Sequence, residues 1–193
     1  MAAVTAALYT WPLGGDAALI PRTPVITEAY QALLETNYER LARWFPGFDK
    51  TPTVEETRAD LQRRGREWVE GSQLPVAIAV RAENGWRPVG EVNLLIDRST
   101  HSAEVGYWID AGFVGRGLVT RAVAVVLDQA FGPLALQRVW LGAITANERS
   151  RSVAVRLGFV QEGVLREAAA FRDGRRDVVV FGLLAHEWRT AAN

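Results

Sequence analysis

Gly115 and Gly117 flank Arg116 at the point where a strand-like segment gives way to an apolar helical pattern. Glycine lets the backbone approach a ligand closely, and the first N–H groups of a helix have no carbonyl partner within it. Such a turn can bind an anion such as a pyrophosphate, because the helix N-terminus carries partial positive charge. It can also be purely structural, since it lacks the Gly-Lys-Ser/Thr ending of a Walker loop and the third glycine of a Rossmann fingerprint.

Metal and thiol chemistry is poorly represented among the 193 residues. The chain has no cysteine, which excludes disulfides, thiolate nucleophiles and Cys-ligated zinc. Its two histidines, His101 and His186, lie far apart in the sequence, so we expect no metal cofactor. The 22 Lys and Arg residues balance the 22 Asp and Glu residues, which leaves no basic field for a nucleic-acid partner.

Composition predicts one globular domain over residues 1–193. Hydrophobic residues make up 49% of the chain, and we find no internal repeat or low-complexity tract. The first residues lack the basic start and long apolar run of a secretory signal, and no segment reaches the ~20 apolar residues of a membrane helix. We therefore expect a cytoplasmic protein with no membrane partner.

The elements that must position the glycine turn follow from hydrophobic periodicity. Apolar residues spaced by three and four predict one helix, Thr53-Val-Glu-Glu56 resembles a capping box that starts a second, and Asn84-Gly85 is typical of a hairpin turn. Helices, an antiparallel run and then alternating strands and helices predict an α+β fold with a crossover in its second half. The predicted helices are 24–44, from 53 onward, 118–131 and 149–157, and the predicted strands are 74–81, 88–96, 103–110, 137–143 and 177–185.

Four sequence blocks follow one another between residues 89 and 163. They are Glu104-Val-Gly-Tyr-Trp-Ile-Asp110, the Gly-Arg-Gly turn, Asn147-Glu-Arg-Ser150 and Leu157-Gly-Phe159. Together they resemble the GNAT superfamily of acyl-CoA-dependent N-acyltransferases, and more closely its RimJ/RimL branch. The resemblance implies a single-domain GNAT-type fold, with a mixed, mostly antiparallel central sheet and helices on both faces. It also implies acetyl-CoA as cosubstrate, an amine acceptor such as a peptide N-terminus, and a monomer or homodimer.

The resemblance assigns the cofactor to the glycine turn and to the strand before it. In the family, backbone amides of the turn hold the CoA pyrophosphate, and the pantetheine arm lies along the strand as an added strand would. Val114 and Val119 depart from the family pattern, which predicts a reduced fit. Asn147 matches an asparagine that binds the cofactor arm, although it can also cap a loop, and Arg149 or Arg151 could reach a phosphate. The implied cofactor-binding residues are Trp108, Ile109, Gly115, Arg116, Gly117, Leu118, Val119, Thr120, Asn147 and Arg149.

The resemblance also implies two catalytic residues. Glu104 matches the catalytic glutamate of some members and could accept the amine proton directly or through water, because an α-amine has a pKa of roughly 7.7 to 8.0. A strand pair or a dimer contact is the other interpretation of Glu104. Ser150 matches a serine beside the cofactor sulfur and could donate to the departing thiolate, or it could cap a helix. Many members carry a tyrosine where this chain has Ala154, so that proton donor is missing.

The acceptor side is the least specified part of the sequence. Trp44 and Phe45 end the first predicted helix and, with Phe171, are candidates to bind the substrate, although aromatic residues at helical spacing are often core. Glu91 is a fallback base, but its alternation with Asn93 on one strand face favours a solvated strand edge. Asp177 is expected in a turn, where a structural salt bridge is favoured over substrate binding.

Three other activities stay open. The acceptor could be a small molecule such as an amino acid or an antibiotic, and the donor could be succinyl-CoA. The chain could also be a non-catalytic acyl-CoA sensor or interaction module, because Ala154 and Ala169 stand where some relatives carry a tyrosine and a carboxylate.

Overall fold

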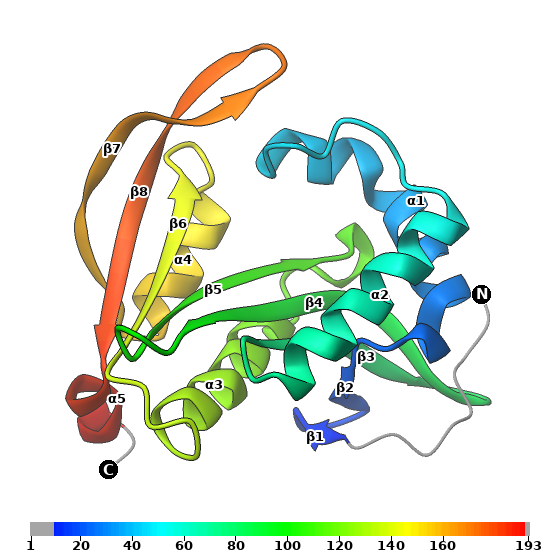
Figure 1. Ribbon diagram of the computed structural model, residues 1–193, viewed down its shortest axis with the longest axis horizontal. Helices are drawn as coiled ribbons and strands as arrows, with labels where there is room; N and C mark the ends of the chain where they lie inside the picture. Colours follow the sequence, from blue (N-terminus) through cyan, green and yellow to red (C-terminus); the bar gives the residue numbers. More distant parts are fainter. Residues whose placement is uncertain (1–9, 192–193) are drawn as a thin grey trace.

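Eight strands form one sheet in the order β1-β2-β3-β4-β5-β6-β8-β7 (Figure 1). The computed structural model describes residues 10–191, so the ends of the predicted domain, residues 1–9 and 192–193, lie outside the described residues. Neighbouring strands are antiparallel except β5 and β6, which run parallel and are joined through α3. The predicted mixed, mostly antiparallel sheet is confirmed. The strands are β1 (Trp11–Pro12), β2 (Ala17–Pro21), β3 (Gln73–Ala82), β4 (Gly85–Asp97), β5 (Ser102–Ile109), β6 (Arg138–Ile144), β7 (Val160–Phe171) and β8 (Gly174–Leu184).

Helices cover both faces of the sheet, as predicted. On the α1/α2 face, Leu33 and Leu61 pack in one cluster with Ala77 of β3. On the opposite α3/α4 face, Val126 and Ala154 belong to a larger cluster that includes the inward-facing residues of β3, β4, β5 and β6. The helices are η1 (Pro24–Ile26), α1 (Thr27–Trp44), α2 (Val54–Val69), η2 (Ala111–Phe113), α3 (Leu118–Phe131), α4 (Glu148–Arg156) and α5 (Ala185–Ala191).

The helix ends follow their local signals. Thr53 Oγ1 accepts from the N–H of Glu56 at 3.2 Å, and the Glu56 carboxylate accepts from the N–H of Thr53 at 2.8 Å, so the predicted capping box is present. The helix predicted over 118–131 has those bounds, with Gly117 in a left-handed conformation before it and Gly132 after it.

The structure contains elements that the periodicity did not predict. Strand β2 is a short, continuously buried run, which has no polar alternation to mark it. Most of β7 is exposed, so it lacks a core-facing stripe. The turn expected at Asp177 lies at residues 172–173 instead, and Asp177 is inside β8. Its carboxylate accepts from the N–H of Glu167 at 2.8 Å where β7 bulges, and it forms no ion pair within residues 10–191.

Candidate active site

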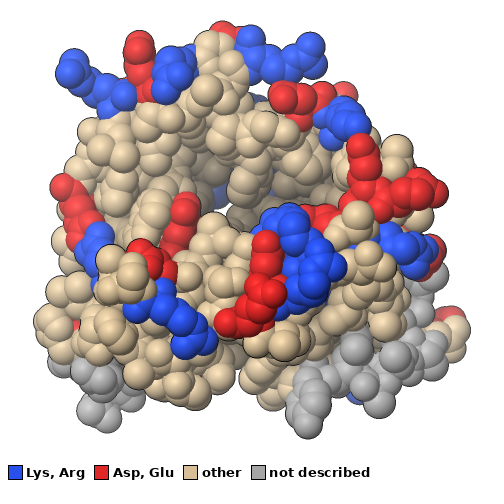
Figure 2. All heavy atoms as spheres, in the orientation of Figure 1, with Lys and Arg blue, Asp and Glu red and all other residues tan. Residues whose placement is uncertain are grey.

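The parallel strands β5 and β6 pair over three residues only and then separate. Ser102, Ala103 and Glu104 lie opposite residues 138–140, while the remainder of each strand pairs only with its other neighbour. We call the gap beyond Glu104 and Trp140 the fork, and these two residues form its apex. The space-filling view shows the molecule hollowed near its centre, in the region that β5, β6 and α1 surround in Figure 1 (Figure 2).

The open edge of β5 presents backbone groups to the fork. The N–H of Asp110 donates to the carbonyl of Val89 at 2.7 Å, and the register of β4 with β5 is regular. Because backbone groups alternate along an antiparallel strand, the N–H groups of Tyr107 and Ile109 point away from β4 and toward the fork. The N–H of Trp108 points toward β4, so the structure places Ile109, together with Tyr107, where Trp108 and Ile109 were expected to bind the cofactor arm.

The glycine turn lies at the open end of the fork, exposed to solvent. Gly115 and Gly117 have φ values of 81° and 69°, a region that glycine adopts without a steric penalty. A Cβ on Gly115 would meet open space, whereas one on Gly117 would lie 3.0 Å from the Arg121 side chain. The Arg116 guanidinium lies 4.6 Å from the Phe113 ring and donates to the Gly112 carbonyl at 3.0 Å. Arg121 donates to the Arg116 and Gly117 carbonyls, while the N–H groups of residues 115–117 have no acceptor among the described residues.

Helix α4 forms the other side of the fork. Asn147 is its N-cap, and its side-chain oxygen accepts from the N–H of Ser150 at 3.2 Å. The side-chain oxygen of Asn147 therefore caps the helix, the predicted contact of Asn147 with the cofactor arm stays a prediction, and the Ser150 hydroxyl takes no part in the cap. Arg151 donates to the Thr145 carbonyl at 3.2 Å, while Arg149 is exposed. Of the two arginines predicted to reach a phosphate, Arg149 is the one whose guanidinium has no hydrogen bond or ion pair among the described residues.

The Ser150 hydroxyl meets a tyrosine that the sequence did not single out. Tyr107 projects from β5 onto the α3/α4 face, where its hydroxyl donates to the Ser150 carbonyl at 3.0 Å and lies 3.1 Å from Ser150 Oγ. Burial raises the pKa of Tyr107 to about 12, so the phenol stays protonated at neutral pH. The position missing a hydroxyl, Ala154, is fully buried in the core. No local pattern links residues 107 and 150, because the contact depends on how β5 and α4 face each other.

Glu104 stands at the apex without a polar partner. Its cross-strand neighbours are Leu95 and Trp140, and we find no hydrogen bond or ion pair for its carboxylate in the described part of the chain. Partial burial raises the pKa of Glu104, since removal from water disfavours the charged form. The strand-pair interpretation of Glu104 therefore has no charged partner to support it, and the carboxylate has the character of a proton acceptor.

The sheet beside Glu104 is open on the α1/α2 face. Gly106 is exposed although β5 is a central strand, and a Cβ built there would meet open space. Opposite Gly106, Asn93 of β4 has a buried side-chain oxygen with no hydrogen-bond partner. A buried polar atom without a partner carries a free-energy cost, and such atoms in native proteins call for an explanation.

Glu91 lies on the same face but in a different environment. It forms an ion pair with Arg22 at 2.9 Å and accepts a hydrogen bond from the Tyr30 hydroxyl, and its side chain is 18% exposed. Burial opposes the charge of Arg22, yet the carboxylates of Glu91 and Asp60 hold the pKa of Arg22 above its usual value. The solvated edge expected for Glu91 is wrong, because β4 is a central strand and α1 and α2 cover this part of it.

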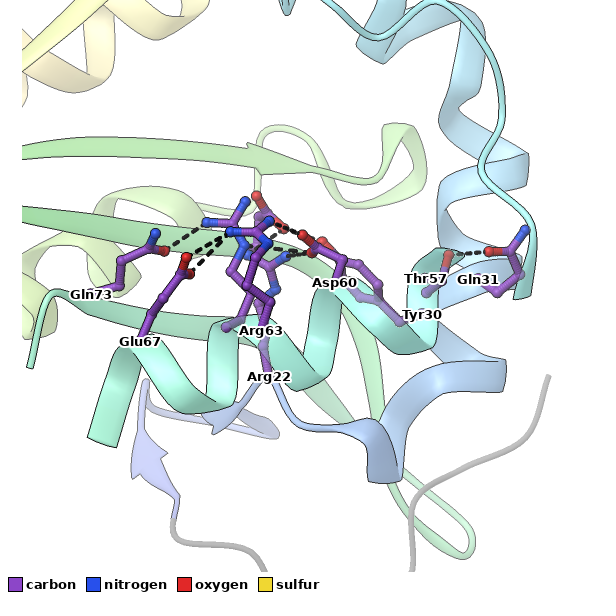
Figure 3. A network of polar contacts seen from close by, with 10 residues as sticks. Arg22, Tyr30, Gln31, Thr57, Asp60, Arg63, Glu67 and Gln73 are labelled. Carbon is purple, nitrogen blue, oxygen red and sulfur yellow. Dashed lines mark hydrogen bonds and ion pairs between the residues drawn. The ribbon is translucent and has the colours of Figure 1, made fainter. Parts of the chain in front are cut away.

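The ion-pair network continues along α2 (Figure 3). Asp60 forms ion pairs with Arg22, at 3.5 Å, and with Arg63. Arg63 in turn forms an ion pair with Glu67 at 2.8 Å. Arg64 extends it to Gln73 at the start of β3, with a hydrogen bond of 2.6 Å. These contacts join α1, α2, β3 and β4 into one polar assembly.

The aromatic candidates for acceptor binding lie near one bridge across the hollow. Arg176 of β8 lies 4.0 Å from the Phe171 ring and donates to the Arg43 carbonyl at 3.3 Å. Arg43 precedes Trp44 at the end of α1, and Phe45 packs against the α1/α2 cluster. The β7–β8 hairpin therefore contacts the end of α1 (Figure 1). Glu91 is not part of this group, because its partners are Arg22 and Tyr30.

Arg40 of α1 is a further residue that sequence reasoning missed. Its Nη1 atom is buried and has no hydrogen-bond partner. Burial, and then the charge of Arg149, lower the pKa of Arg40, while Asp110 raises it. Arg40 and Arg149 are thus two guanidinium groups, from α1 and α4, that lack an ion pair among the residues described. Such a pair is suited to an anion.

Residues 10–191 contain neither a metal-ligand cluster nor a membrane-spanning helix. No three His, Cys, Asp or Glu side chains of this segment gather where they could hold a metal ion. No helix in the same segment is long and apolar enough to span a membrane.

Comparison with known proteins places this architecture in a family. Residues 21–160 match the family described as "Acetyltransferase (GNAT) domain". The chain is 39% identical over 93 residues to "Putative ribosomal N-acetyltransferase YdaF" of Bacillus subtilis (strain 168), covering 48% of this chain and 51% of that one. It is 30% identical over 86 residues to "Ribosomal-protein-serine acetyltransferase" of Escherichia coli (strain K12), covering 45% and 48%. The alignments thus span about half the length of these curated relatives.

A solved structure extends the likeness to nearly the whole chain. A crystal structure described as "Probable acetyltransferase" superimposes with a TM-score of 0.86 at 26% identity, covering 93% of this chain and 99% of that one. The matched family segment includes α1, α2, the fork, the glycine turn and α4. The chain therefore belongs to the GNAT acetyltransferase family.

Proposed function

We propose that this protein transfers an acetyl group from acetyl-CoA to the N-terminal α-amine of a protein or peptide. The observation that carries the proposal is the position of Glu104. A carboxylate that has no polar partner among residues 10–191, and whose pKa burial raises, lies at the apex of a fork whose open end holds a turn suited to an anion. Family membership supports acetyl transfer, and the names of two relatives, which refer to ribosomal or ribosomal-protein acetyltransferases, support a protein acceptor.

The acyl donor would bind along β5 and the glycine turn. The N–H groups of Tyr107 and Ile109 suit the amides of an extended pantetheine arm, which would add to the open edge of β5 as a strand does. The N–H groups of the turn and of the first turn of α3 suit a pyrophosphate. Arg149 supplies a nearby positive charge, and Arg40 faces it from α1. The turn residues proposed to contribute backbone groups are Gly115, Arg116, Gly117, Leu118, Val119 and Thr120.

Glu104 would take the proton from the acceptor amine, directly or through one water molecule. The neutral amine then attacks the thioester carbonyl, a C–N bond forms, and the N–H of Ile109 stabilises the oxyanion of the tetrahedral intermediate. The attacking nitrogen loses its remaining extra proton to water as the intermediate collapses and the C–S bond breaks, and the Ser150 hydroxyl donates a hydrogen bond to the thiolate that leaves. No covalent acyl-enzyme is required, in keeping with a chain that has no cysteine.

The acceptor would approach on the α1/α2 face. Gly106 leaves room beside Glu104, and the end of α1 and the β7–β8 hairpin border the hollow. We assign Trp44, Phe45 and Phe171 to this border as contacts for the first residues of the acceptor. Glu91 supports the same face through Arg22 and Tyr30, so its contribution is to hold the wall of the site in place.

The test is an acetylation assay with a mixed acceptor pool. Purified protein is incubated with acetyl-CoA and peptides that have free N-termini, together with N-terminally blocked lysine peptides and small amines, and mass shifts of 42 Da per acetyl group, roughly, are read by mass spectrometry. We expect shifts on free α-amines and none on the blocked peptides. Shifts on lysine or on small amines alone would contradict the proposed acceptor.

Two controls separate the remaining activities. Succinyl-CoA in place of acetyl-CoA tests the acyl group, and binding of acetyl-CoA without any product would favour a sensor. Glu83, an exposed residue of the β3–β4 turn, provides a matched Glu→Gln control for Glu104.

A further inference from the structure

The contact between Tyr107 and Ser150 connects the two sides of the fork through side chains. Tyr107 belongs to β5 and Ser150 to the first turn of α4. At the level of Tyr107, β5 is no longer paired with β6, the strand that precedes α4. Two atoms of Ser150 lie within hydrogen-bond distance of one phenolic oxygen, the carbonyl at 3.0 Å and Oγ at 3.1 Å. A purely structural contact between β5 and α4 would need only one of these two hydrogen bonds.

Hydroxyl groups carry one hydrogen and can accept two, so the three oxygens have two arrangements. When Tyr107 donates to the Ser150 carbonyl, Ser150 Oγ can donate back to the phenolic oxygen. When Tyr107 donates to Ser150 Oγ, the Ser150 hydrogen is released to another acceptor. Only hydrogens move between the two arrangements, because Asn147 holds the N–H of Ser150 at 3.2 Å and fixes the helix turn.

We propose that Tyr107 is a positioning residue that switches the Ser150 hydroxyl to donate to the sulfur of the departing coenzyme A thiolate. This inference rests on the proposed function and adds a residue to it. As negative charge develops on sulfur, Ser150 turns its hydrogen toward it, and Tyr107 turns its own hydrogen from the carbonyl to Oγ. No proton is transferred from one group to another, so the step needs no acid. The thiolate gains a hydrogen-bond donor, Ser150, that itself accepts a hydrogen bond from Tyr107.

The surroundings of the pair favour this role. Tyr107 is partly buried, and its raised pKa keeps its hydrogen in place over the pH range in which the thiol of coenzyme A ionises. A chain of hydrogen bonds polarises its members in a site away from water, so a donor supported from behind is stronger than an isolated one. Ala154, in the same helix, offers no hydroxyl. The pair therefore supplies the donor that this position lacks.

Binding of free coenzyme A tests the proposal without turnover. The thiol has a pKa of about 8.5 in solution, so a protein that stabilises the thiolate binds coenzyme A more tightly as the pH rises from 7 to 9.5. We expect an increase of about ten-fold for the native protein, and about three-fold or less for Tyr107→Phe and for Ser150→Ala. Desulfo-coenzyme A, which has no sulfur, should bind with the same pH dependence to all three proteins.

Several charged groups face the pair, and the sulfur-free ligand accounts for them. Arg156 of α4 lowers the pKa of Tyr107, Arg149 and Arg151 lie on the same helix, and Glu104 lies on the other face of β5. The arginines stay charged over this range. Any effect of Glu104 on the backbone of β5 would alter the binding of both ligands, so the difference between the two ligands reports the sulfur alone.

Kinetics provide the second readout. If Tyr107 acts through Ser150, the double variant should lose no more kcat than Ser150→Ala alone, whereas independent contributions would multiply. We expect a loss of about ten-fold in kcat for each single variant and a similar loss for the double variant, with KM for the acceptor nearly unchanged. Tyr38→Phe is the matched control, because Tyr38 also donates to a backbone carbonyl, that of Asp49 at 2.7 Å, away from the fork.

The possible outcomes are distinct. A sulfur-specific pH dependence that Tyr107→Phe abolishes supports the inference. Equal pH dependence for coenzyme A and its desulfo analogue, or a Tyr107→Phe variant that differs from the native protein only in melting temperature, overturns it and leaves the proposed acetyl transfer standing. Failure of the native protein to bind either ligand overturns both.

Discussion

Glu91 and Glu104 lie on one face of the sheet in neighbouring strands, yet their environments are opposite. Glu91 has Arg22 and Tyr30 as partners and belongs to a network that joins α1, α2, β3 and β4. Glu104 has no polar partner within residues 10–191, and burial raises its pKa. The comparison shows two uses of a carboxylate in one fold, one that holds helices on the sheet and one that is kept available for a proton.

The same contrast extends to their neighbours. Around Glu91 the buried carboxylate has an ion-pair partner, although the Nε and Nη1 atoms of Arg22 are buried there without a hydrogen bond. Near the fork, Asn93 and Arg40 each bury a polar atom that has neither a hydrogen bond nor an ion pair in the described part of the chain. Unpaired buried groups cost stability, and they concentrate where a protein binds or transforms a ligand. The network on α2 thus stabilises a wall beside a region that is left unsatisfied.

The largest expected effect comes from removing the ion pair between Arg22 and Glu91. Arg22→Met leaves Glu91 without its ion pair in a covered position, and loss of one partner of a buried pair costs about 3 kcal/mol. Urea unfolding of the variant measures this cost. The control is Lys50→Met, which removes a pair whose lysine is 73% exposed and should change stability by less than about 1 kcal/mol. Equal losses in the two variants would show that the network adds nothing to ordinary surface pairing.

Next in size is the loss of the unpaired carboxylate. Glu104→Gln removes the proton acceptor and should lower kcat/KM for the acceptor by about 100-fold near neutral pH. The native rate should rise with pH through the raised pKa of Glu104, because only the carboxylate accepts a proton, and the variant should lack that rise. Initial rates between pH 5 and 9 provide the profile, with Glu83→Gln alongside. An unchanged profile in Glu104→Gln removes this residue from the mechanism.

A smaller effect is expected where α2 begins. Thr53→Ala removes the side-chain acceptor of the capping box, which should cost about 1 kcal/mol of unfolding free energy. Because α2 carries Asp60, the substitution should weaken the ion-pair network and leave the fork unchanged. Acetyl transfer at saturating substrate should therefore stay near the native rate. Thermal denaturation followed by circular dichroism and one rate measurement suffice. A large loss of rate with little loss of stability would argue that α2 takes part in the reaction.

The smallest expected effect is on the pH dependence of stability, and it tests the difference between Glu91 and Glu104 most directly. The folded pKa of Glu104 is raised above its ordinary value of 4.5, so folding favours the protonated form, and its contribution to stability is lost as the pH rises through the folded pKa. At pH 7, Glu104→Gln should therefore be at least as stable as the native protein, and the two should converge near pH 4. Glu91→Gln should instead be less stable at pH 7. Destabilisation by both substitutions would falsify the distinction between the two carboxylates.

Local signals in the sequence predicted the elements better than the site. The capping box at Thr53 and the glycines around residues 118–131 are read from neighbours in the chain, so α2 and α3 were predicted closely. The contacts that define the site join residues far apart, 61 positions for Tyr30 and Glu91 and 43 for Tyr107 and Ser150. Periodicity does not say which strand edges separate, and so the fork, the partners of Glu91 and the role of Tyr107 required the structure.

The hydrogen bond between Arg176 and the carbonyl of Arg43 joins the β7–β8 hairpin to the end of α1. If the proposed acceptor reaches Glu104 past this contact, the end of a chain can enter beside it, while an internal segment needs room for the chain on both sides. One exposed hydrogen bond contributes only about 1 kcal/mol, so opening this contact would add a small cost for an internal segment and none for a free terminus. Selectivity for chain ends would then arise from connectivity as well as from the chemistry of the amine.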